Sequence, residues 1–240
     1  GDAGQLLVEL AGWVRTQSGP SGLPDWNNWL EALFVRDEAR EVDIDRQAAE
    51  PVDHINPLRL LRELNALLDD DSIIVADGGD FVATASYTLR PRGPLSWLDP
   101  GVFGTLGVGA GFALGARMAR PDAETWVIYG DGAFGFSLAE FDTFVRHGIP
   151  VIAVVGNDGS WAQIAREQVK ILGDDVGTVL ERTHYHRAAE GLGAAGMLLD
   201  EPDKINQVLQ EAKFVAATGR PVLVNVMIGG TDFREGSISM

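Results

Sequence analysis

Two aspartates follow apolar runs of the sequence, at points where buried strands would meet their loops. Asp131 comes after the run at 126–129, and Asp158 comes after the run at 151–155. If these strands are neighbours, the two carboxylates converge at one edge of the sheet and repel each other unless a cation or a proton lies between them. Magnesium prefers carboxylate and carbonyl oxygens and completes its shell with phosphate or water oxygens. The pattern therefore predicts a binding site for a metal ion and a diphosphate group.

Small residues near Asp131 fit the same chemistry. Gly130 and Gly132 flank this carboxylate and allow a ligand to approach the backbone closely. A helix expected to begin near Ser137 would direct its N-terminal amides toward an anion. The residues alone leave a simpler interpretation open, because aspartate is common in the turns that follow strands.

Alternating strand and helix patterns would position these residues. The alternation predicts an α/β domain with a mostly parallel sheet and helices on both faces, because its apolar runs are nearly continuous. Open sheets of this class bind ligands at the carboxyl ends of their strands, where Asp77, Asp131 and Asp158 are all expected. The predicted strands are 72–76, 125–130, 150–156, 221–228 and a weaker one at 195–199. The predicted helices lie near 104–119, 137–147, 161–170, 184–192 and 203–218.

The N-terminal part lacks the alternating strand and helix pattern of the rest of the chain. An amphipathic helix is expected over 1–17, a break over 18–24 and a further helix over 25–40. Asn56 and Pro57 should start the organised domain, because asparagine caps helices and proline suits the first turn. The sequence therefore divides into a helical segment, a linker and a main domain, with the boundaries 1–18, 19–55 and 56–240.

Composition excludes several classes of protein and partner. The 240 residues carry a net charge of −16, which disfavours binding to nucleic acids and anionic membranes. The chain has no cysteine, so disulfides, thiolate metal sites and thiol nucleophiles are excluded, and a cytoplasmic, reducing location is expected. No apolar stretch approaches the roughly 20 residues that span a bilayer, and the N-terminus lacks the pattern of a signal peptide.

The two aspartates belong to a spacing pattern that resembles the motif of thiamine diphosphate (ThDP) enzymes. In this chain, Gly-Asp-Gly at 130–132 is followed after 24 residues by Asn157-Asp158, where the family usually has two asparagines. The segments 104–109 and 148–150 are similar to those of the decarboxylase and acetolactate synthase branch. The likeness covers residues 56–240 and implies the diphosphate domain of the ThDP-binding fold. Residues 1–18 resemble the last helix of the family's middle domain, which is otherwise absent.

The resemblance implies a magnesium site and a diphosphate site. Asp131 and Asp158 would bind Mg²⁺ through their side chains, and Ser160 would bind it through its backbone carbonyl. Aspartate in place of asparagine at position 158 adds a negative charge beside the diphosphate, and a dependence on Mg²⁺ is still expected. The residues expected to contact the diphosphate are Asp77, Gly78, Gly79, Gly130, Gly132 and Ala133.

Two residues would act directly on the reactive part of the cofactor. Leu106 matches the apolar residue that wedges ThDP into a bent shape, which brings its 4′-amino group near C2 of the thiazolium ring. Gly104 matches the position whose carbonyl accepts a hydrogen bond from that amino group. The resemblance therefore assigns Leu106 and Gly104 to catalysis.

Further segments resemble the acetolactate-synthase-like 2-hydroxyacyl-CoA lyases, at 141–147, 166–168 and 231–238. That resemblance implies a lyase that cleaves a 2-hydroxyacyl-CoA to formyl-CoA and an aldehyde or ketone. It also implies a lid-like C-terminal tail, in which Arg234 would contact CoA while Phe233 and Ile238 pack against the acyl group. A frayed terminus is the alternative interpretation.

The family's catalytic glutamate lies on a pyrimidine-binding domain, which the resemblance places on another chain or in a missing N-terminal region. A dimer or tetramer and an acyl-CoA substrate are therefore expected. Two other functions stay open, an acetolactate-synthase-type carboligase or decarboxylase of 2-oxo acids and a non-catalytic ThDP-fold subunit.

Other candidate residues favour structural interpretations. His147 should complement a helix dipole, and His184 and His186 are expected in polar packing. Glycines within 107–111 lack the spacing of a dinucleotide loop, and the surroundings of Ser160 do not match a hydrolase nucleophile.

Overall fold

The computed structural model describes residues 1–17 and 25–236. The break predicted over 18–24 and the position of Ile238 lie outside these residues. The chain forms two compact units, Gly1–Asp43 and Ile44–Met240. In the part of the chain that is described, no helix is both long and apolar enough to cross a lipid bilayer.

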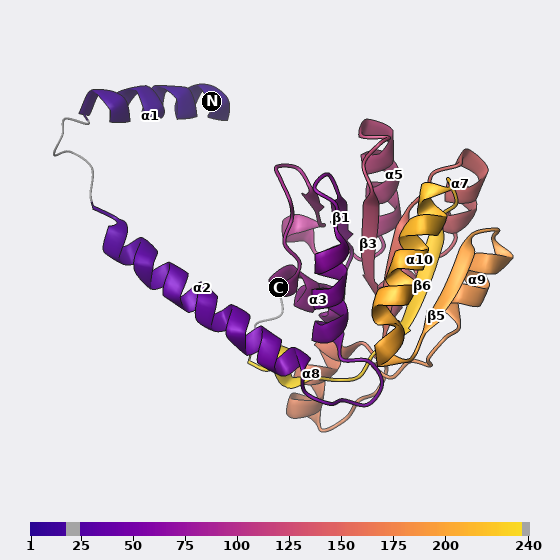
Figure 1. The fold of residues 1–240 in the computed structure, drawn as a ribbon. Helices are drawn as coiled ribbons and strands as arrows, with labels where there is room; N and C mark the ends of the chain where they lie inside the picture. The colour runs from indigo at the N-terminus through magenta and orange to yellow at the C-terminus, as the bar shows by residue number, and fades with distance from the viewer. Residues whose placement is uncertain (18–24, 237–240) are drawn as a thin grey trace. The chain divides into compact units, whose positions relative to one another are not determined.

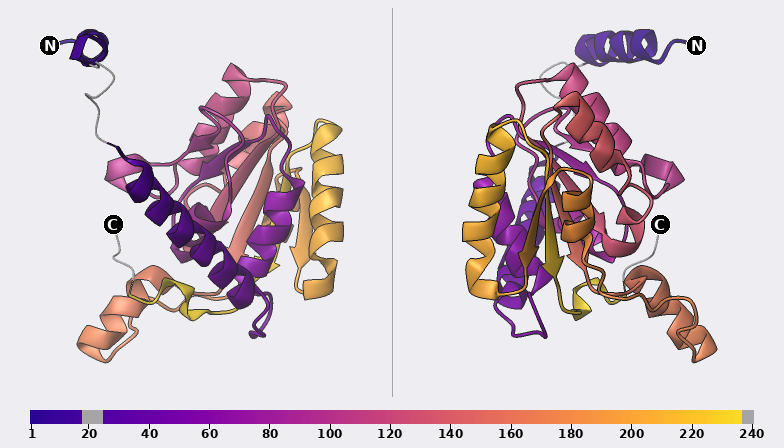
Figure 2. Two further views of the ribbon diagram at one scale, coloured as in Figure 1. Left: turned by 60° about the vertical axis from the view of Figure 1, so that its left-hand side comes forward. Right: turned by 90° about the vertical axis from the view of Figure 1, so that its right-hand side faces the viewer.

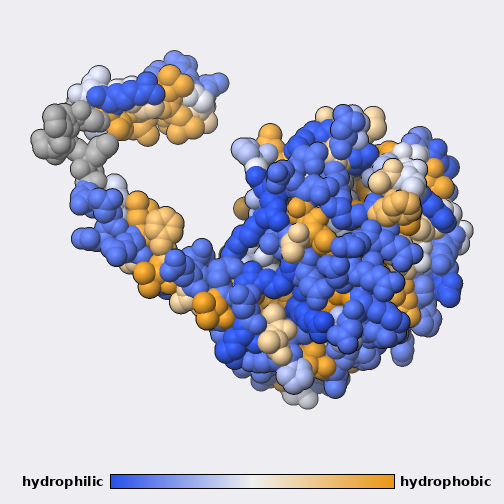
Figure 3. Space-filling view, viewed as in Figure 1, coloured by the Kyte–Doolittle hydropathy of each residue, from blue (hydrophilic) through white to orange (hydrophobic). Residues whose placement is uncertain are grey.

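The first unit consists of helical segments (Figure 1). Helix α1 spans Ala3–Gln17, as the sequence predicted. Helix α2 spans Asn27–Ala48, so it continues beyond the predicted end at residue 40 and enters the second unit. Both helices expose large apolar side chains, which are visible as hydrophobic patches in Figure 3.

The second unit is built on a six-stranded sheet with the order β2-β1-β3-β4-β6-β5. All neighbouring strands are parallel, so the predicted fold class is confirmed. Every residue of β1, β3, β4 and β6 is buried, because helices cover both faces of the sheet. The strands are β1 (Ile73–Ala76), β2 (Trp97–Leu98), β3 (Thr125–Gly130), β4 (Ile152–Asn157), β5 (Ala195–Leu199) and β6 (Val222–Met227).

Helices pack against the sheet in two layers on opposite sides (Figure 2). One layer contains α3 (Pro57–Leu67), α4 (Asp80–Thr88) and α10 (Ile205–Ala217). The other contains α5 (Gly109–Ala119), α7 (Glu140–His147) and α9 (Tyr185–Gly191). On β3, Trp126 and Ile128 belong to the core under the first layer, and Val127 and Tyr129 belong to the core under the second. This division follows from the alternation of side chains along a strand.

Two helices, α5 and α6, differ from the predictions. Helix α5 begins at Gly109 because Gly104 and Gly107 have positive φ angles of 56° and 82°, which no α-helix contains. A short helix, α6 (Asp131–Phe134), which the sequence did not predict, begins directly after β3, and the helix expected over 137–147 is α7, which begins at Glu140. Helix α8 (Ala162–Leu172) forms where predicted, and although all its residues are described, none is buried.

Asn56 joins the end of α2 to the start of α3. Its Oδ1 accepts a hydrogen bond from the backbone N of Leu58 at 2.9 Å, and its Nδ2 donates to the carbonyls of Gln47 and Glu50. The predicted cap is therefore present. The compact unit nevertheless begins at Ile44, before this cap, because Ile44 is buried in a cluster with Leu58 and Phe233.

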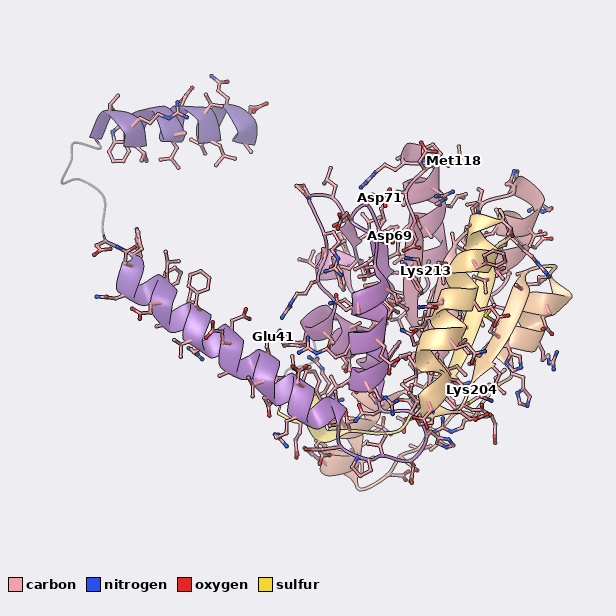
Figure 4. All side chains as sticks on the ribbon, viewed as in Figure 1. Glu41, Asp69, Asp71, Met118, Lys204 and Lys213 are labelled. Atoms are coloured by element: carbon pink, nitrogen blue, oxygen red, sulfur yellow. The ribbon has the colours of Figure 1, made fainter. Side chains whose placement is uncertain are left out.

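A charged cluster closes the amino ends of the strands. Lys213 on α10 donates to Asp69 at 2.8 Å and lies 3.2 Å from Glu124, and Figure 4 shows Lys213 and Asp69 near one another. Glu124 also accepts hydrogen bonds from Ser72 and Trp126.

At the opposite edge of the sheet, where the strands have their carboxyl ends, the strand order changes direction. The chain passes from β1 to β2 on one side of β1 and then to β3 on the other side. Such a change of direction creates a crevice in which sheets of this class bind ligands.

Candidate functional site

A cavity of about 530 Å³ lies at the carboxyl ends of β1, β3 and β4. It gathers every residue that the sequence assigned to a cofactor or a metal ion, although these residues come from four separate parts of the chain. Their convergence requires the strand order, since no two of these parts are adjacent in sequence. The predicted residues that line the cavity are Asp77, Gly78, Gly79, Gly104, Leu106, Gly130, Asp131, Gly132, Ala133, Asp158 and Ser160.

Asp131 and Asp158 lie at adjacent strand ends. The parallel pairing of β3 with β4 places Gly130 opposite Gly156, and the two aspartates follow within two residues. Asp131 is buried, its Oδ1 accepts a hydrogen bond from the N–H of Gly132, and its Oδ2 accepts one from the N–H of Gly159, both at 2.8 Å. The Oδ1 of Asp158 accepts a hydrogen bond from the N–H of Ser160 at 3.0 Å.

The two carboxylates are electrostatically coupled. Burial raises the pKa of Asp158, and the negative charge of Asp131 raises it further, to about 7. Burial also raises the pKa of Asp131, against the effect of its hydrogen bonds from Gly132 and Gly159. A divalent cation would relieve this unfavourable charge, so the pair fits a metal such as Mg²⁺. Within the described residues, no group of three or more His, Cys, Asp or Glu side chains forms a metal cluster, so backbone oxygens would have to complete the shell.

Glycines around the pair leave no room for side chains. A Cβ atom on Gly132 would lie 2.7 Å from the ring of Trp161, and one on Gly130 would lie 3.0 Å from the carbonyl oxygen of Gly78. The N–H of Gly130 donates to that carbonyl at 3.1 Å, which holds the ends of β1 and β3 together. The backbone therefore forms the floor of the cavity, as a closely bound diphosphate requires.

The carboxylate of Asp77, which the resemblance placed near the diphosphate, accepts hydrogen bonds from two backbone amides. Its Oδ1 accepts a hydrogen bond from the N–H of Gly107 at 2.8 Å, and its Oδ2 accepts one from the N–H of Gly109 at 2.6 Å. These bonds attach the segment that carries Leu106 to the end of β1. Leu106 itself lies against Gly78, where a Cβ atom would come within 2.2 Å of its Cδ2.

Sequence reasoning missed several residues of the cavity wall. They come from elements that gave no clear signal in the sequence, namely α4 and β2, and from the start of α8. Trp97 and Asp99 are joined by a hydrogen bond of 2.7 Å between Nε1 and Oδ2, which shapes the wall beside Gly104. The missed residues include Phe81, Tyr87, Trp97, Asp99, Trp161 and Gln163.

The C-terminal segment packs differently from the expectation for its side chains. Phe233 is buried in the cluster that contains Ile44 and Leu58, its ring contacts Tyr87, and it is not among the residues that line the cavity. Arg234 lines the cavity, but its guanidinium stacks over the ring of Tyr87 at 5.2 Å, and its Nε lies 4.0 Å from Asp80. Through these contacts the segment is attached to the domain as far as Arg234.

Comparison with known families identifies the fold of this site. A family model described as thiamine pyrophosphate enzyme, C-terminal TPP binding domain, matches residues 77–226. The chain belongs to this family. Thiamine pyrophosphate is another name for ThDP, so the match supports ThDP as the cofactor of the cavity. The match includes the two aspartates, Leu106, the strands β2, β3, β4 and β5 and nearly all of β6, and it begins directly after β1.

Individual relatives of this TPP binding domain carry two kinds of name. The chain is 54% identical to 2-hydroxyacyl-CoA lyase 2 of Bos taurus over 243 residues, which cover all of this chain and 38% of that protein. It is 38% identical to the acetolactate synthase large subunit of Mycobacterium tuberculosis over 231 residues, which cover 95% of this chain and 40% of that protein. The chain thus spans about two fifths of the length of these relatives.

A solved structure shares the fold. The ThDP-dependent 4-hydroxybenzoylformate decarboxylase of Rhodococcus jostii superposes with a TM-score of 0.69 and 23% sequence identity. The similarity covers 77% of this chain and 34% of the decarboxylase chain. At this identity the comparison supports the architecture of the domain and carries no information on its substrate.

The raised pKa of Asp158 predicts a pH effect on the TPP binding domain without metal. Because the pKa is about 7 in the folded chain and near its ordinary value of 3.8 when unfolded, ionisation of Asp158 destabilises the fold as pH rises through this interval. We expect Asp158→Asn to stabilise the chain by about 2 kcal/mol at pH 8, and the difference to vanish near pH 4. Urea denaturation with a chelator present measures this difference.

Asp174→Asn is the matched control for that experiment. Asp174 is exposed and also accepts a backbone hydrogen bond, from Val176 at 2.9 Å, so its replacement removes the same charge without relieving a buried pair. If Asp158→Asn and Asp174→Asn gave the same pH profile, the coupling between Asp131 and Asp158 would be absent.

Proposed function

We propose that the chain is the diphosphate- and magnesium-binding part of a ThDP-dependent lyase. The proposed reaction cleaves a 2-hydroxyacyl-CoA to formyl-CoA and an aldehyde or ketone. One observation carries this proposal: a cavity that gathers the whole ThDP motif lies in a chain about half identical, over its full length, to 2-hydroxyacyl-CoA lyase 2 of several animals. When bound, ThDP would supply a nucleophilic carbon and an electron sink for breaking a carbon–carbon bond.

The residues of the cavity divide into those that anchor and those that orient the cofactor. In this proposal Asp131 and Asp158 bind Mg²⁺ through carboxylate oxygens, and the carbonyl of Ser160 provides a third ligand. A metal ion held by these residues would neutralise the coupled carboxylates and would leave coordination positions for the diphosphate. The backbone of Gly132 and Ala133 would lie close to that diphosphate, although the N–H of Gly132 also donates to Asp131.

Leu106 and Gly104 orient the ring end of the cofactor. Both line the cavity, and Leu106 keeps 37% of its surface exposed although it is apolar. An exposed leucine in a cavity wall is available to a ligand, which supports a role in bending ThDP. The left-handed backbone at Gly104 turns the chain at the cavity margin.

We further propose that a pyrimidine-binding domain covers this cavity, contributed by another chain or by a further part of the same protein, in a dimer or tetramer. Several strongly exposed apolar residues line the cavity or lie within three residues of its lining residues in the sequence. They include Val102, Phe103, Phe136 and Ile164. Phe136 lies against Gly107 and tilts toward the ring of Trp161 on the cavity wall. Exposed apolar groups of this size usually mark an interface.

An assay of the full-length protein that contains this chain tests the function. With ThDP, Mg²⁺ and a 2-hydroxyacyl-CoA, we expect formyl-CoA and an aldehyde or ketone to appear, and omission of ThDP should abolish both products. Formation of acetolactate from pyruvate without formyl-CoA would favour the carboligase, which the 38% identity to an acetolactate synthase subunit supports. Binding of ThDP with neither reaction would favour a non-catalytic subunit.

A further inference from the structure

Asp77 carries a buried carboxylate whose two oxygens face the segment that contains Leu106. Only 2% of Asp77 is exposed, and it directly follows β1. Oδ1 accepts from Gly107 and Oδ2 accepts from Gly109, so both oxygens have a backbone donor. Hydrogen bonds from amides to a carboxylate are stronger than those between neutral groups. Asp77 therefore connects the end of the first strand to a segment thirty residues away in sequence.

The chemistry of this position argues against a simple role in binding the diphosphate. A carboxylate close to a diphosphate would repel it unless a metal ion lay between them, and the motif assigns the metal ion to Asp131 and Asp158. Burial of Asp77 raises its pKa, while the hydrogen bonds from Gly107 and Gly109 lower it. The two amides thus stabilise the negative charge of the Asp77 carboxylate.

The segment from residue 104 to residue 109 is shaped to fit against Asp77. Gly109 has no room for a side chain, because a Cβ atom would lie 2.8 Å from Oδ2 of Asp77 and 2.8 Å from Cε1 of Tyr129. Gly107 has a φ of +82°, and its carbonyl accepts a hydrogen bond from Oγ of Ser137 at 3.0 Å. The backbone on the C-terminal side of Leu106 is therefore held on two sides.

Leu106 itself has little side-chain packing to fix its position. It is 37% exposed, it belongs to none of the hydrophobic core clusters among the described residues, and it lies against Gly78. The place of its side chain in the cavity therefore depends on the backbone at Gly107 and Gly109. A small shift of this backbone would move the Leu106 side chain away from a ligand, and misplacement by about 1 Å is enough to reduce catalysis strongly.

We propose that Asp77 is a positioning residue that holds the segment 104–109 in place through two backbone amides and so fixes Leu106 under the cofactor. The inference rests on the proposed function only for the consequence of moving Leu106. The tether between Asp77 and the two glycines concerns this chain alone.

Amide hydrogen exchange in the full-length protein without cofactor tests the tether. In Asp77→Asn one of the two amides loses its acceptor, because the side-chain NH₂ group of asparagine cannot accept a hydrogen bond. We expect exchange at Gly107 or Gly109, whichever amide loses its acceptor, to become at least about tenfold faster, the result of losing roughly 1.4 kcal/mol of local stability. Asp174→Asn, which removes an exposed charge, should leave exchange in 104–109 unchanged. Unchanged exchange in Asp77→Asn would overturn the proposal.

Kinetics of the loaded enzyme test the consequence for Leu106. We expect kcat of Asp77→Asn to fall at least about tenfold, while KM for the acyl-CoA and the affinity for ThDP change less than about threefold. A collapse of ThDP affinity with unchanged exchange would show that Asp77 contacts the diphosphate and would overturn the proposal.

A second variant keeps the test decisive if Asp77→Asn does not fold. Asp77→Ser keeps one acceptor and buries no charge, so the same faster exchange is expected at Gly107 or Gly109. Absence of that change in a folded Asp77→Ser protein would equally overturn the proposal. Because exchange is measured without cofactor or substrate, the test of the tether remains valid even if the protein does not catalyse the lyase reaction.

Discussion

Asp131→Asn is expected to abolish Mg²⁺-dependent binding of ThDP. The side chain is buried, so a neutral amide replaces a carboxylate at fixed geometry and the metal ion loses a charged ligand. Asparagine also cannot accept both hydrogen bonds that Gly132 and Gly159 now donate. We expect the affinity for ThDP in the presence of Mg²⁺ to fall by at least about 100-fold, or about 2.7 kcal/mol. Titration calorimetry on the full-length protein measures this loss.

Asp158→Asn provides the comparison at the neighbouring position. Its effect on ThDP affinity should be smaller, because its asparagine can still offer an oxygen to the metal ion and because it removes the repulsion that raises the pKa of Asp158. A larger loss in Asp158→Asn than in Asp131→Asn would contradict the assignment of the two ligands. Unchanged ThDP affinity in Asp131→Asn would show that Asp131 is not a ligand of the metal ion.

Leu106→Ala is expected to reduce turnover much more than cofactor binding. The side chain lines the cavity and is partly exposed, so its truncation leaves Asp131, Asp158 and the glycines of the diphosphate site in place. We expect turnover per bound cofactor to fall about 10- to 100-fold, or about 1.4 to 2.7 kcal/mol, with ThDP affinity within about threefold. Steady-state kinetics combined with calorimetry on the same preparation separate the two effects.

Leu95→Ala is the matched control for Leu106. Leu95 is 87% exposed and is not among the residues that line the cavity. Its truncation should change neither turnover nor affinity. If Leu106→Ala instead lowered ThDP affinity strongly with unchanged turnover per bound cofactor, Leu106 would contribute to packing of the site and not to the shape of the cofactor.

The sequence by itself determined the main strands of the sheet and the residues of the cavity that were assigned to the cofactor and the metal ion. Strands β1, β3, β4 and β6 are readable because parallel strands covered on both faces require continuous apolar runs. The cap at Asn56 is readable because its hydrogen bonds depend on neighbouring residues. Asp77, Asp131 and Asp158 were readable because each follows a predicted strand and a parallel sheet brings strand ends to one edge. Gly104, Leu106 and Ser160 were assigned only by the resemblance to ThDP enzymes.

Contacts between distant segments were decided only in the tertiary structure. Strand β2 has two residues and forms only beside β1, so it leaves no periodic pattern. Helix α4 contains threonine and serine, which favour helices weakly, and packing against the core compensates for this.

The orientation of polar side chains was also beyond the sequence. The direction of the Asp77 carboxylate could not be predicted, because its partners Gly107 and Gly109 approach it only once β1 and α5 pack together. The same holds for Arg234, whose stacking on Tyr87 depends on how the C-terminal segment crosses α4. Local patterns specify which residues end a strand, whereas the direction of a buried polar group is set by donors and acceptors that the fold brings from elsewhere.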